Sequence, residues 1–276
     1  MDIRLIALDL DGTLLDNEKK LSAGNLAALT YCIQHGIEIV PATGRPASGI
    51  PDFVRNIPGV RYGILTNGAR VEDLVNGTVI SEQLIDWKLA YEILSLLSHY
   101  PVAYDPYIGG RGKMEPRFRN HLEQYGLPPV MQQLVLCTRD EVEDELKYVS
   151  EKKGYIEKIN IFTADPQLRM ELWTLLKKYS ELIVTSSLDY NLEINAVSAT
   201  KGEGLASLAS HLGLGLNETM AFGDGSNDFS MIKTAGIGVA MANAMDILKE
   251  QADYITLSND NDGVAAAIWH FLKSSV

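Results

Sequence analysis

Two carboxylates spaced at i and i+2 are the most reactive feature of this sequence. Asp9 and Asp11 follow a short apolar segment, residues 3–8, and Gly12 and Thr13 come directly after them. If residues 3–8 form a strand, both carboxylates point to the same side, toward whatever lies beyond the end of the strand. Two such charges repel each other unless a cation or a shared proton lies between them. The alternative is a polar turn, because Asp-Gly is also common in turns.

Further polar groups follow other apolar segments of the same kind. Residues 37–40 precede Thr43, and residues 219–222 precede Asp224 and Asp228. In open α/β sheets, ligands bind at the carboxyl ends of the strands, so we expect these groups to converge. The predicted site holds one threonine, one lysine and four carboxylates: Asp9, Asp11, Thr43, Lys201, Asp224 and Asp228.

This set of side chains predicts a Mg²⁺ site that serves phosphoryl transfer. Clustered carboxylates bind hard cations, and Mg²⁺ suits a site with few protein ligands and room for water. Thr43 and Lys201 supply donors for a phosphoryl group, whose transfer chiefly requires positioning and charge neutralisation. Aspartate is also a known nucleophile that forms aspartyl-phosphate intermediates.

The elements that position these residues alternate between strand and helix. A helix is expected between Ser22, as its N-cap, and Gly36, just past its end. Such alternation predicts an α/β fold with a Rossmann-like doubly wound parallel sheet. From residue 84 to residue 194 the pattern changes to α+β. We therefore expect a core domain in two parts, 1–83 and 195–276, and an inserted α+β cap domain, 84–194, with hinges near Gln83 and Ala196.

Two hairpins are predicted from glycine-containing turns, at Asn76-Gly77 and at Gly109-Gly110. The second is followed by Arg111 and Lys113, two cations on a flexible turn. They are either specificity residues for an anionic substrate or part of a solvated hairpin tip, and the second interpretation is favoured.

The composition excludes several classes of partner. With 276 residues, 46% of them hydrophobic, the chain suits a large core and a second, smaller domain. A formal charge of −12 argues against binding to nucleic acid or to an anionic membrane surface. No segment has the length and apolarity of a membrane span, so we expect a cytoplasmic protein. Cys32 and Cys137 lack metal-site spacing and are expected to be buried thiols. The sequence leaves the oligomeric state open.

Four ordered motifs resemble those of the haloacid dehalogenase (HAD) superfamily. They are Asp9-Leu10-Asp11-Gly12-Thr13, Ala42-Thr43-Gly44-Arg45, Lys201-Gly202 and Gly223-Asp224-Gly225-Ser226-Asn227-Asp228. More narrowly, the chain resembles the Cof-like sugar-phosphate phosphatases, whose type II cap is inserted between the second and third motifs. The resemblance covers nearly the whole chain and is weakest between residues 84 and 194.

The resemblance implies a Mg²⁺-dependent phosphatase acting on small phosphorylated metabolites, among which sugar phosphates are expected. Asp9 would be the nucleophile, and Asp11 would protonate the leaving alcohol and then activate water. Asp9, the backbone carbonyl of Asp11, and Asp224 would bind Mg²⁺, and Asp228 would support the metal or contact it. The residues implied around the phosphoryl group are Leu10, Thr43, Gly44, Lys201 and Asn227. Asn227 would also support the metal, and Arg45 would contact the substrate or the cap, or form a surface pair.

Two alternative functions stay open at this point. A sugar phosphomutase can share these motifs and this cap placement, and it differs in retaining the phosphoryl group. A phospho-accepting signalling domain of the receiver type also uses an acidic cluster, a threonine and a lysine. Receivers, however, hold the acceptor aspartate and the acidic pair on different strands and carry no long insertion. A catalytically inactive binding module is disfavoured because every motif residue is present.

Overall fold

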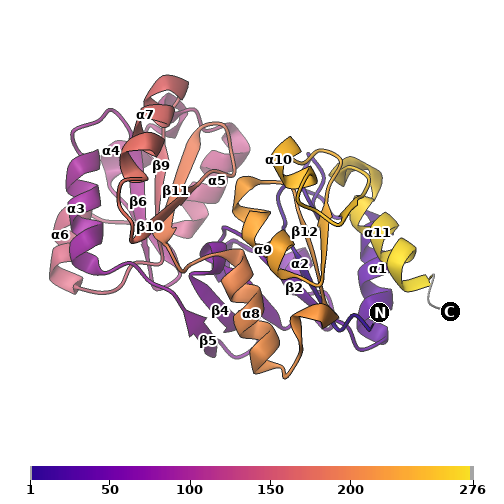
Figure 1. Cartoon of the computed structure of the whole chain (residues 1–276). Coiled ribbons are helices and arrows are strands. Elements are labelled where there is room, and N and C mark those ends of the chain that lie inside the picture. The colour runs from indigo at the N-terminus through magenta and orange to yellow at the C-terminus, as the bar shows by residue number, and fades with distance from the viewer. Residues whose placement is uncertain (1, 274–276) are drawn as a thin grey trace. The chain divides into compact units, whose positions relative to one another are not determined.

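The computed structural model describes residues 2–273, which form two compact units (Figure 1). The core unit consists of the chain up to Glu82 and from Thr200 onward, and the inserted unit is Gln83–Ala199. The second division lies five residues later than the predicted start at 195, because strand β11 (Asn191–Ala196) runs on to Ala196 and pairs there with strand β10 (Leu182–Thr185).

A parallel five-stranded sheet forms the centre of the core unit, in the order β14-β13-β12-β1-β2. Strand β1 lies between β12 and the edge strand β2, and Leu8 is level with Phe222 on one side and with Pro41 on the other. The strands are β1 (Leu5–Leu8), β2 (Glu38–Pro41), β12 (Thr219–Gly223), β13 (Ile237–Ala240) and β14 (Tyr254–Ile255). The apolar residues of β1, β2, β12 and β13 are buried, as expected of a parallel sheet that is covered on both faces, whereas Ile255 on the edge strand β14 is exposed.

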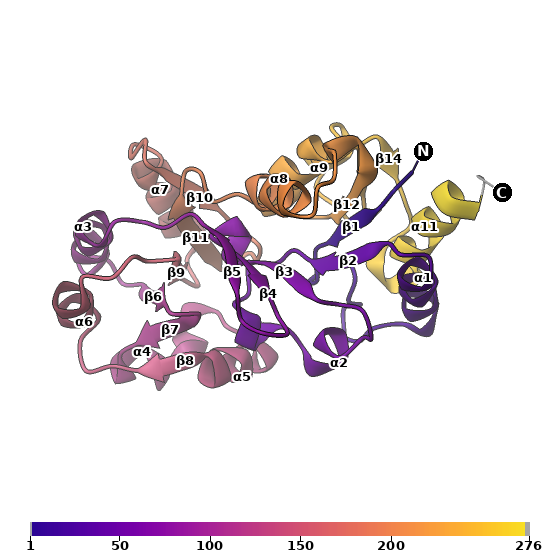
Figure 2. The same ribbon diagram turned by 90° about the horizontal axis from the view of Figure 1, so that it is seen from below.

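Helices cover both faces of this sheet, which confirms the predicted doubly wound arrangement (Figure 2). Helices α1 and α11 pack together, and α8 packs against α9, which contacts β12 and β13. Ser22 caps α1 as predicted, by accepting a hydrogen bond from the backbone N–H of Asn25 at 3.0 Å. The helices of the core unit are α1 (Ala23–Gln34), α2 (Asp52–Arg55), α8 (Lys201–His211), α9 (Phe229–Thr234), α10 (Asp246–Lys249) and α11 (Gly263–Lys273).

A second, antiparallel sheet belongs to the core unit. It consists of β3 (Tyr62–Leu65), β4 (Arg70–Asp73) and β5 (Val79–Glu82). The sequence predicts residues 62–65 as a further strand of the parallel sheet, but β3 meets that sheet only through one parallel bridge, between Ala42 and Ile64. Its main partner is β4, which follows closely in the chain.

The inserted unit is built on a six-stranded sheet in the order β10-β11-β9-β6-β7-β8. The remaining strands are β6 (Ala103–Ile108), β7 (Arg111–Met114), β8 (Arg139–Glu141) and β9 (Lys158–Phe162). Its helices are α3 (Trp87–Leu97), α4 (Pro116–Arg119), α5 (Pro129–Thr138), α6 (Glu145–Lys152) and α7 (Pro166–Leu176). The predicted hairpin at Gly109-Gly110 is confirmed, since β6 and β7 pair antiparallel and both glycines have positive φ.

On β9 and β11, polar and charged side chains on one face of this sheet alternate with apolar residues on the opposite face, whereas on β7 and β8 that opposite face carries Lys113 and Asp140. Two buried ion pairs lie on the polar face, Arg139 with Asp105 at 2.9 Å and Lys158 with Glu193 at 2.7 Å. Helices α4 and α5 were not predicted, and the sequence pattern predicts a helix from Glu141, where strand β8 ends instead. Cys137 is exposed, contrary to the expectation, whereas Cys32 of the core unit is buried as expected.

Candidate active site

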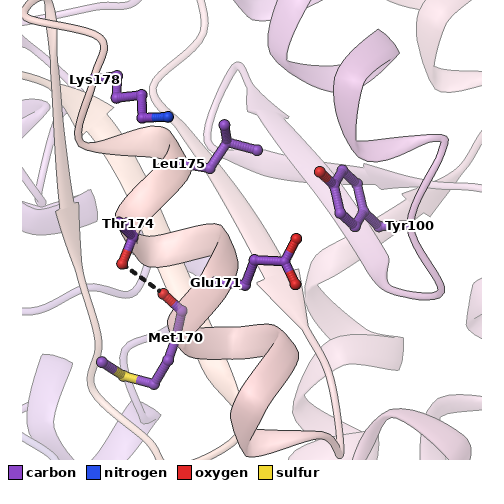
Figure 3. A pocket seen from close by; sticks show the side chains of 6 residues that line it. All are labelled: Tyr100, Met170, Glu171, Thr174, Leu175 and Lys178. Carbon is purple, nitrogen blue, oxygen red and sulfur yellow. Dashed lines mark hydrogen bonds between the residues drawn. The ribbon is translucent and has the colours of Figure 1, made fainter.

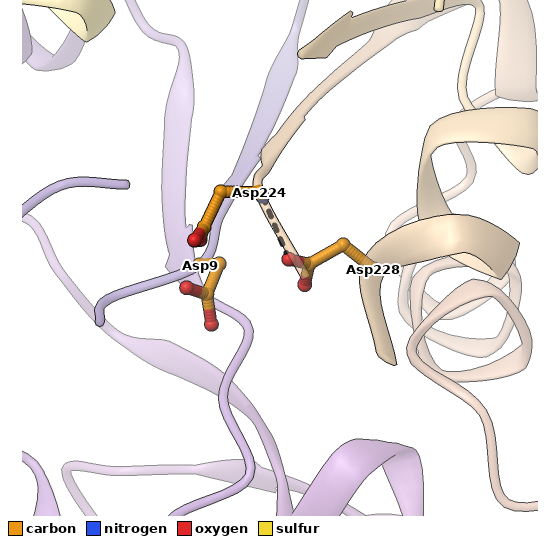
Figure 4. A group of neighbouring side chains, drawn as sticks. All are labelled: Asp9, Asp224 and Asp228. Atoms are coloured by element: carbon orange, nitrogen blue, oxygen red, sulfur yellow. Dashed lines mark hydrogen bonds between the residues drawn. The ribbon is translucent and has the colours of Figure 1, made fainter. Parts of the chain in front are cut away.

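Two acidic side chains meet where β1 and β12 end side by side (Figure 4). Asp9 follows β1, and its backbone N–H donates to the carbonyl of Phe222 on β12 at 3.1 Å. Asp224 follows the last residue of β12, and Asp228 comes from the short 3₁₀ turn Ser226–Asp228. Carboxylate oxygens of these three aspartates lie within 4.8 Å of one another. The predicted convergence at the carboxyl edge of the sheet is therefore present.

Lys201 lies against this acidic cluster, defined here as Asp9, Asp224 and Asp228. It is the first residue of α8 and is fully buried. Its Nζ is 2.7 Å from Oδ1 of Asp9 and 2.5 Å from Oδ1 of Asp228. Burial lowers the pKa of Lys201, but the two carboxylates outweigh burial and raise it, so the amine is charged.

One lysine does not neutralise three carboxylates. Burial raises the pKa of Asp9 well above its usual range, and the neighbouring carboxylates add to this while Lys201 opposes it. Burial, followed by the charge of Asp228, raises the pKa of Asp224 to about 7. The excess of negative charge gives this site a reason to bind a cation.

Both carboxylate oxygens of Asp228 accept hydrogen bonds from neighbouring groups of the site. Its Oδ2 accepts hydrogen bonds from the backbone N–H groups of Asp224 and Gly225, each at 2.9 Å, and its Oδ1 accepts from Lys201. A Cβ on Gly223 would lie only 2.3 Å from the Cβ of Asp228, so the close approach requires glycine. Asp228 therefore shapes the loop and anchors Lys201, and its two oxygens are engaged in doing so.

Thr13 orients Asp224, a role that was not predicted from the sequence. Its hydroxyl donates to Oδ1 of Asp224 at 2.9 Å. The adjacent Gly12 has φ +88°, and a Cβ there would lie 2.4 Å from Oδ2 of Asp224. The only signal for Thr13 in the sequence is its place directly after the Asp-Gly pair.

The carboxylate of Asp11 is outside the acidic cluster and is held by two cations. Nε of Arg45 donates to Oδ2 at 2.8 Å, and Nη2 donates to Oδ1 at 2.7 Å. Nζ of Lys19 is 2.9 Å from Oδ1. Burial raises the pKa of Asp11, but Arg45 and Lys19 outweigh burial and lower it to about 2. Of the three possibilities left open for Arg45, an ion pair is present, and its partner is a site residue. Lys19 was not predicted, because it stands in a polar run with no motif around it.

The other predicted phosphate ligands lie close to the same edge of the sheet. Thr43 is buried two residues after β2, and its backbone N–H donates to the carbonyl of Ile64 at 2.8 Å. The carbonyl of Thr43 accepts from Asn67, whose side chain accepts from Nδ2 of Asn227 at 3.1 Å. Leu10 is buried at the turn after β1, where its carbonyl accepts from the N–H of Leu15 at 2.9 Å. Gly44 follows Thr43 directly.

The two cations of the inserted hairpin share one acidic partner. Nε of Arg111 and Nζ of Lys113 each lie 2.6 Å from the carboxylate of Asp140 on β8. Lys113 is buried, so the favoured interpretation of a solvated tip does not hold for it. Asp140 offsets the positive charge on which the specificity interpretation depends.

The inserted unit contains a hollow whose lining mixes apolar and charged side chains, unlike the acidic cluster (Figure 3). Tyr100 and side chains of α7 and the segment after it line this hollow, among them Glu171 and Lys178. The hydroxyl of Thr174 donates to the carbonyl of Met170 in its own helix at 3.0 Å. Within residues 2–273, the acidic cluster is the one group of three or more candidate metal-binding side chains. No helix in this part of the chain is both long enough and apolar enough to cross a membrane.

Comparisons with known proteins agree with the motifs. A sequence profile of haloacid dehalogenase-like hydrolases matches residues 6–268. Phosphatase YwpJ of Bacillus subtilis (strain 168) is 32% identical, over 98% of this chain and 100% of the relative. From the same organism, 5-amino-6-(5-phospho-D-ribitylamino)uracil phosphatase YcsE is 32% identical, over 99% of this chain and 97% of the relative. The solved structure of a haloacid dehalogenase-like hydrolase from B. subtilis has a TM-score of 0.86 and 31% identity, covering 98% of this chain and 100% of the other.

Proposed function

Since the chain belongs to the haloacid dehalogenase-like hydrolase family, as a Cof-like phosphatase, we propose that it hydrolyses small phosphate monoesters with Mg²⁺ through an aspartyl-phosphate on Asp9. The observation that carries this proposal is the contact between the buried Lys201 and the buried Asp9 inside the acidic cluster. A nucleophilic carboxylate needs a cation beside it, because the cation offsets the repulsion between the carboxylate and the anionic phosphoryl group.

The donor set fits Mg²⁺. Carboxylate oxygens are the ligands that this ion prefers, and it keeps several waters where the protein supplies few ligands. We propose that Asp9, Asp224 and the backbone carbonyl of Asp11 hold the ion, and that Asp228 acts by positioning Lys201 and the loop. When bound, Mg²⁺ supplies positive charge that offsets the repulsion between Asp9 and the phosphoryl oxygens.

The chain's own residues then carry the reaction in two steps. In the first, an oxygen of Asp9 forms a bond to phosphorus, and the bond from phosphorus to the leaving oxygen breaks with its electron pair, that oxygen taking a proton from Asp11. In the second, water attacks phosphorus and gives its proton to Asp11, and the electron pair of the Asp9–phosphorus bond returns to Asp9. The two cations on Asp11 favour its ionised form, which suits the second step. In the first step Asp11 has to carry a proton, so Arg45 or Lys19 must move away from its carboxylate when substrate binds.

Phosphate binding is assigned to the residues around this cluster. Lys201 is held in place by Asp9 and Asp228 and offsets the charge of the phosphoryl oxygens. Thr43 and the amide of Gly44 follow the end of β2, next to β1. The other assigned contacts are Leu10 and Asn227, the latter fixed by its hydrogen bond to Asn67.

The proposed substrates are small phosphorylated metabolites, with sugar phosphates and phosphorylated polyols first among them. The relative named as a 5-amino-6-(5-phospho-D-ribitylamino)uracil phosphatase supports this choice, because its named substrate carries a phosphate on a ribityl chain. We propose that the inserted unit acts as a cap and selects the leaving group.

The test combines a substrate panel with an isosteric variant. Phosphate release should be measured from sugar phosphates, polyol phosphates, nucleotides and phosphoglycolate, with Mg²⁺ and with excess chelator. Asp9→Asn should abolish turnover, since the amide is not a nucleophile, whereas Asp246→Asn, at an exposed aspartate, should leave it unchanged. Full activity in chelator, or more than a few per cent of activity in Asp9→Asn, contradicts the mechanism. An isomerised sugar phosphate in place of free phosphate would identify a phosphomutase instead.

A further inference from the structure

Three donor groups contact the Asp11 carboxylate, two from Arg45 and one from Lys19. An ionised carboxylate offers about four lone-pair sites, two on each oxygen. Arg45 donates one hydrogen bond to each oxygen, and Nζ of Lys19 forms an ion pair with Oδ1 at 2.9 Å. Within residues 2–273, Oδ2 therefore receives one donor, from Arg45, while Oδ1 receives two. The two oxygens of Asp11 are not equivalent.

Lys19 is held at this position by its own turn. Its φ is +63°, a left-handed conformation that is uncommon for residues other than glycine. Its backbone N–H donates to the carbonyl of Asp16 at 2.9 Å, and the N–H of Lys20 donates to Oδ1 of Asp16 at 2.8 Å. The N–H of Asp16 donates in return to the carbonyl of Lys20 at 3.0 Å. These bonds fix an unfavourable backbone conformation, as is common where a side chain must be aimed.

The neighbouring lysine shows that the placement is specific. Lys20 pairs with Glu18 at 2.5 Å, and both side chains are at least 70% exposed. The side chain of Lys19 is 33% exposed and that of Asp11 is 29% exposed. Two adjacent lysines thus differ in that one reaches the site and the other faces solvent.

We propose that Lys19 is a positioning residue that reserves Oδ2 of Asp11 for the water that hydrolyses the phosphorylated Asp9. This inference rests on the proposed function. By filling the second site of Oδ1, Lys19 leaves the open site on Oδ2 as the place where a proton can be accepted. In the step it serves, water attacks phosphorus, its proton goes to Oδ2, and the electron pair of the Asp9–phosphorus bond returns to Asp9. Without Lys19, water can pair with either oxygen, and fewer encounters have the productive geometry.

The test uses p-nitrophenyl phosphate, whose leaving group departs without needing a proton. Asp9 should then be phosphorylated at the normal rate in Lys19→Ala, while its hydrolysis is slowed about tenfold. We expect kcat and KM to fall together with kcat/KM unchanged, and a burst of p-nitrophenol close to one per site. A merely structural defect would lower the burst amplitude instead.

Four further variants make the test specific. Lys20→Ala should behave as wild type. Lys19→Gly, which suits the positive φ, should match Lys19→Ala if the amine is what matters, and Lys19→Arg should restore part of kcat. Asp11→Asn should show the same burst with slower hydrolysis, and adding Lys19→Ala to it should have no further effect.

The outcomes separate this inference from the proposed function. If Asp11→Asn gives no burst, the covalent mechanism or the base role of Asp11 fails, and both proposals are overturned. If Asp11→Asn gives the burst and Lys19→Ala does not, only the role of Lys19 is overturned. A fall in kcat/KM for Lys19→Ala, or a further loss in the Asp11→Asn background, also overturns it, because Lys19 would then act before hydrolysis or independently of Asp11.

Discussion

The hydroxyl of Thr13 donates a 2.9 Å hydrogen bond to Oδ1 of Asp224, a residue 211 positions away in the chain. This bond joins the turn after β1 to the turn after β12, and it fixes one oxygen of a proposed Mg²⁺ ligand. Partners that orient a metal ligand typically affect metal affinity or activity by about 10–100-fold.

Thr13→Val should therefore raise the Mg²⁺ concentration needed for half-maximal activity by about tenfold or more. Valine matches threonine in shape but cannot donate the bond. Thr13→Ser keeps the hydroxyl and should stay close to wild type. The measurement is a Mg²⁺ titration of activity, and an unchanged requirement in Thr13→Val would show that Asp224 is oriented by other contacts.

Removing the buried lysine should destabilise the metal-free protein. Lys201→Met leaves the acidic cluster with no positive charge beside Asp9 and Asp228. Breaking a buried ion pair by removing one partner costs about 3–5 kcal/mol. Denaturant unfolding in chelator should show a loss of that order, and Lys20→Met, at an exposed lysine, should show little. A loss below 1 kcal/mol would mean that protonation of the carboxylates compensates for the missing charge of Lys201.

Mg²⁺ should raise the melting temperature, and Asp224→Asn should remove most of that rise. A ligand present at about 100 times its Kd stabilises the folded state by about 2.7 kcal/mol. In chelator, Asp224→Asn should melt above wild type, because one of the mutually repelling carboxylates is gone. Thermal unfolding of both proteins, with and without Mg²⁺, measures the effect. An equal rise in both would place the ion elsewhere.

The inserted unit should show a pH-dependent stability that comes from Glu145. This buried residue accepts from the backbone N–H of Glu115 at 2.8 Å, and burial, together with Glu115, raises its pKa from 4.5 to about 10. The folded state therefore keeps a proton that the unfolded state releases above pH 4.5. The resulting contribution to stability is complete below pH 4.5 and is lost progressively as the pH rises toward 10.

Glu145→Gln cannot ionise and should be free of this loss. It should melt close to wild type at pH 5 and above it at pH 8.5, with each kcal/mol worth about 2–4 °C. Glu151→Gln, at an exposed position on the same helix, is the matched control. A difference in melting temperature that does not grow with pH would argue against a protonated Glu145.

The acidic cluster could be predicted from the sequence because it depends on backbone topology. Asp9 and Asp224 each follow a strand, and parallel neighbours end at the same edge of the sheet. Lys201 could be assigned to the site because Lys201-Gly202 matches the third of the four ordered motifs. For these residues, local pattern and motif order point to the same answer.

The contacts of Asp11 and Asp228 could not be predicted in the same way. Lys19 reaches Asp11 through a left-handed residue, and no local propensity favours that conformation for lysine. Asp228 has its oxygens taken by Lys201 and by two backbone N–H groups, which depends on the path of the loop within a few tenths of an ångström. A motif gives the residue type and leaves its hydrogen-bond partners undetermined.

Long-range strand pairing limited the prediction of the fold. Strand β3 has the apolar pattern of a buried parallel strand, yet it pairs mainly with β4, which lies close to it in the chain. The ion pairs of Arg111 and Lys113 were not predicted, because their partner Asp140 lies on β8, a strand with only three residues. Such a short strand gives no detectable periodicity.

The position of β1 between β2 and β12 has a consequence for biosynthesis. One edge of β1 pairs with β2, which leaves the ribosome soon after it, but the other edge pairs with β12. At ~5–20 residues per second, the intervening chain takes about 10–40 s to emerge. During that time the nascent chain presents an apolar unpaired strand edge, which is a template for aggregation. The inserted unit, Gln83–Ala199, is translated in this interval, so its whole sequence is synthesised before β12 can complete the sheet that carries Asp9.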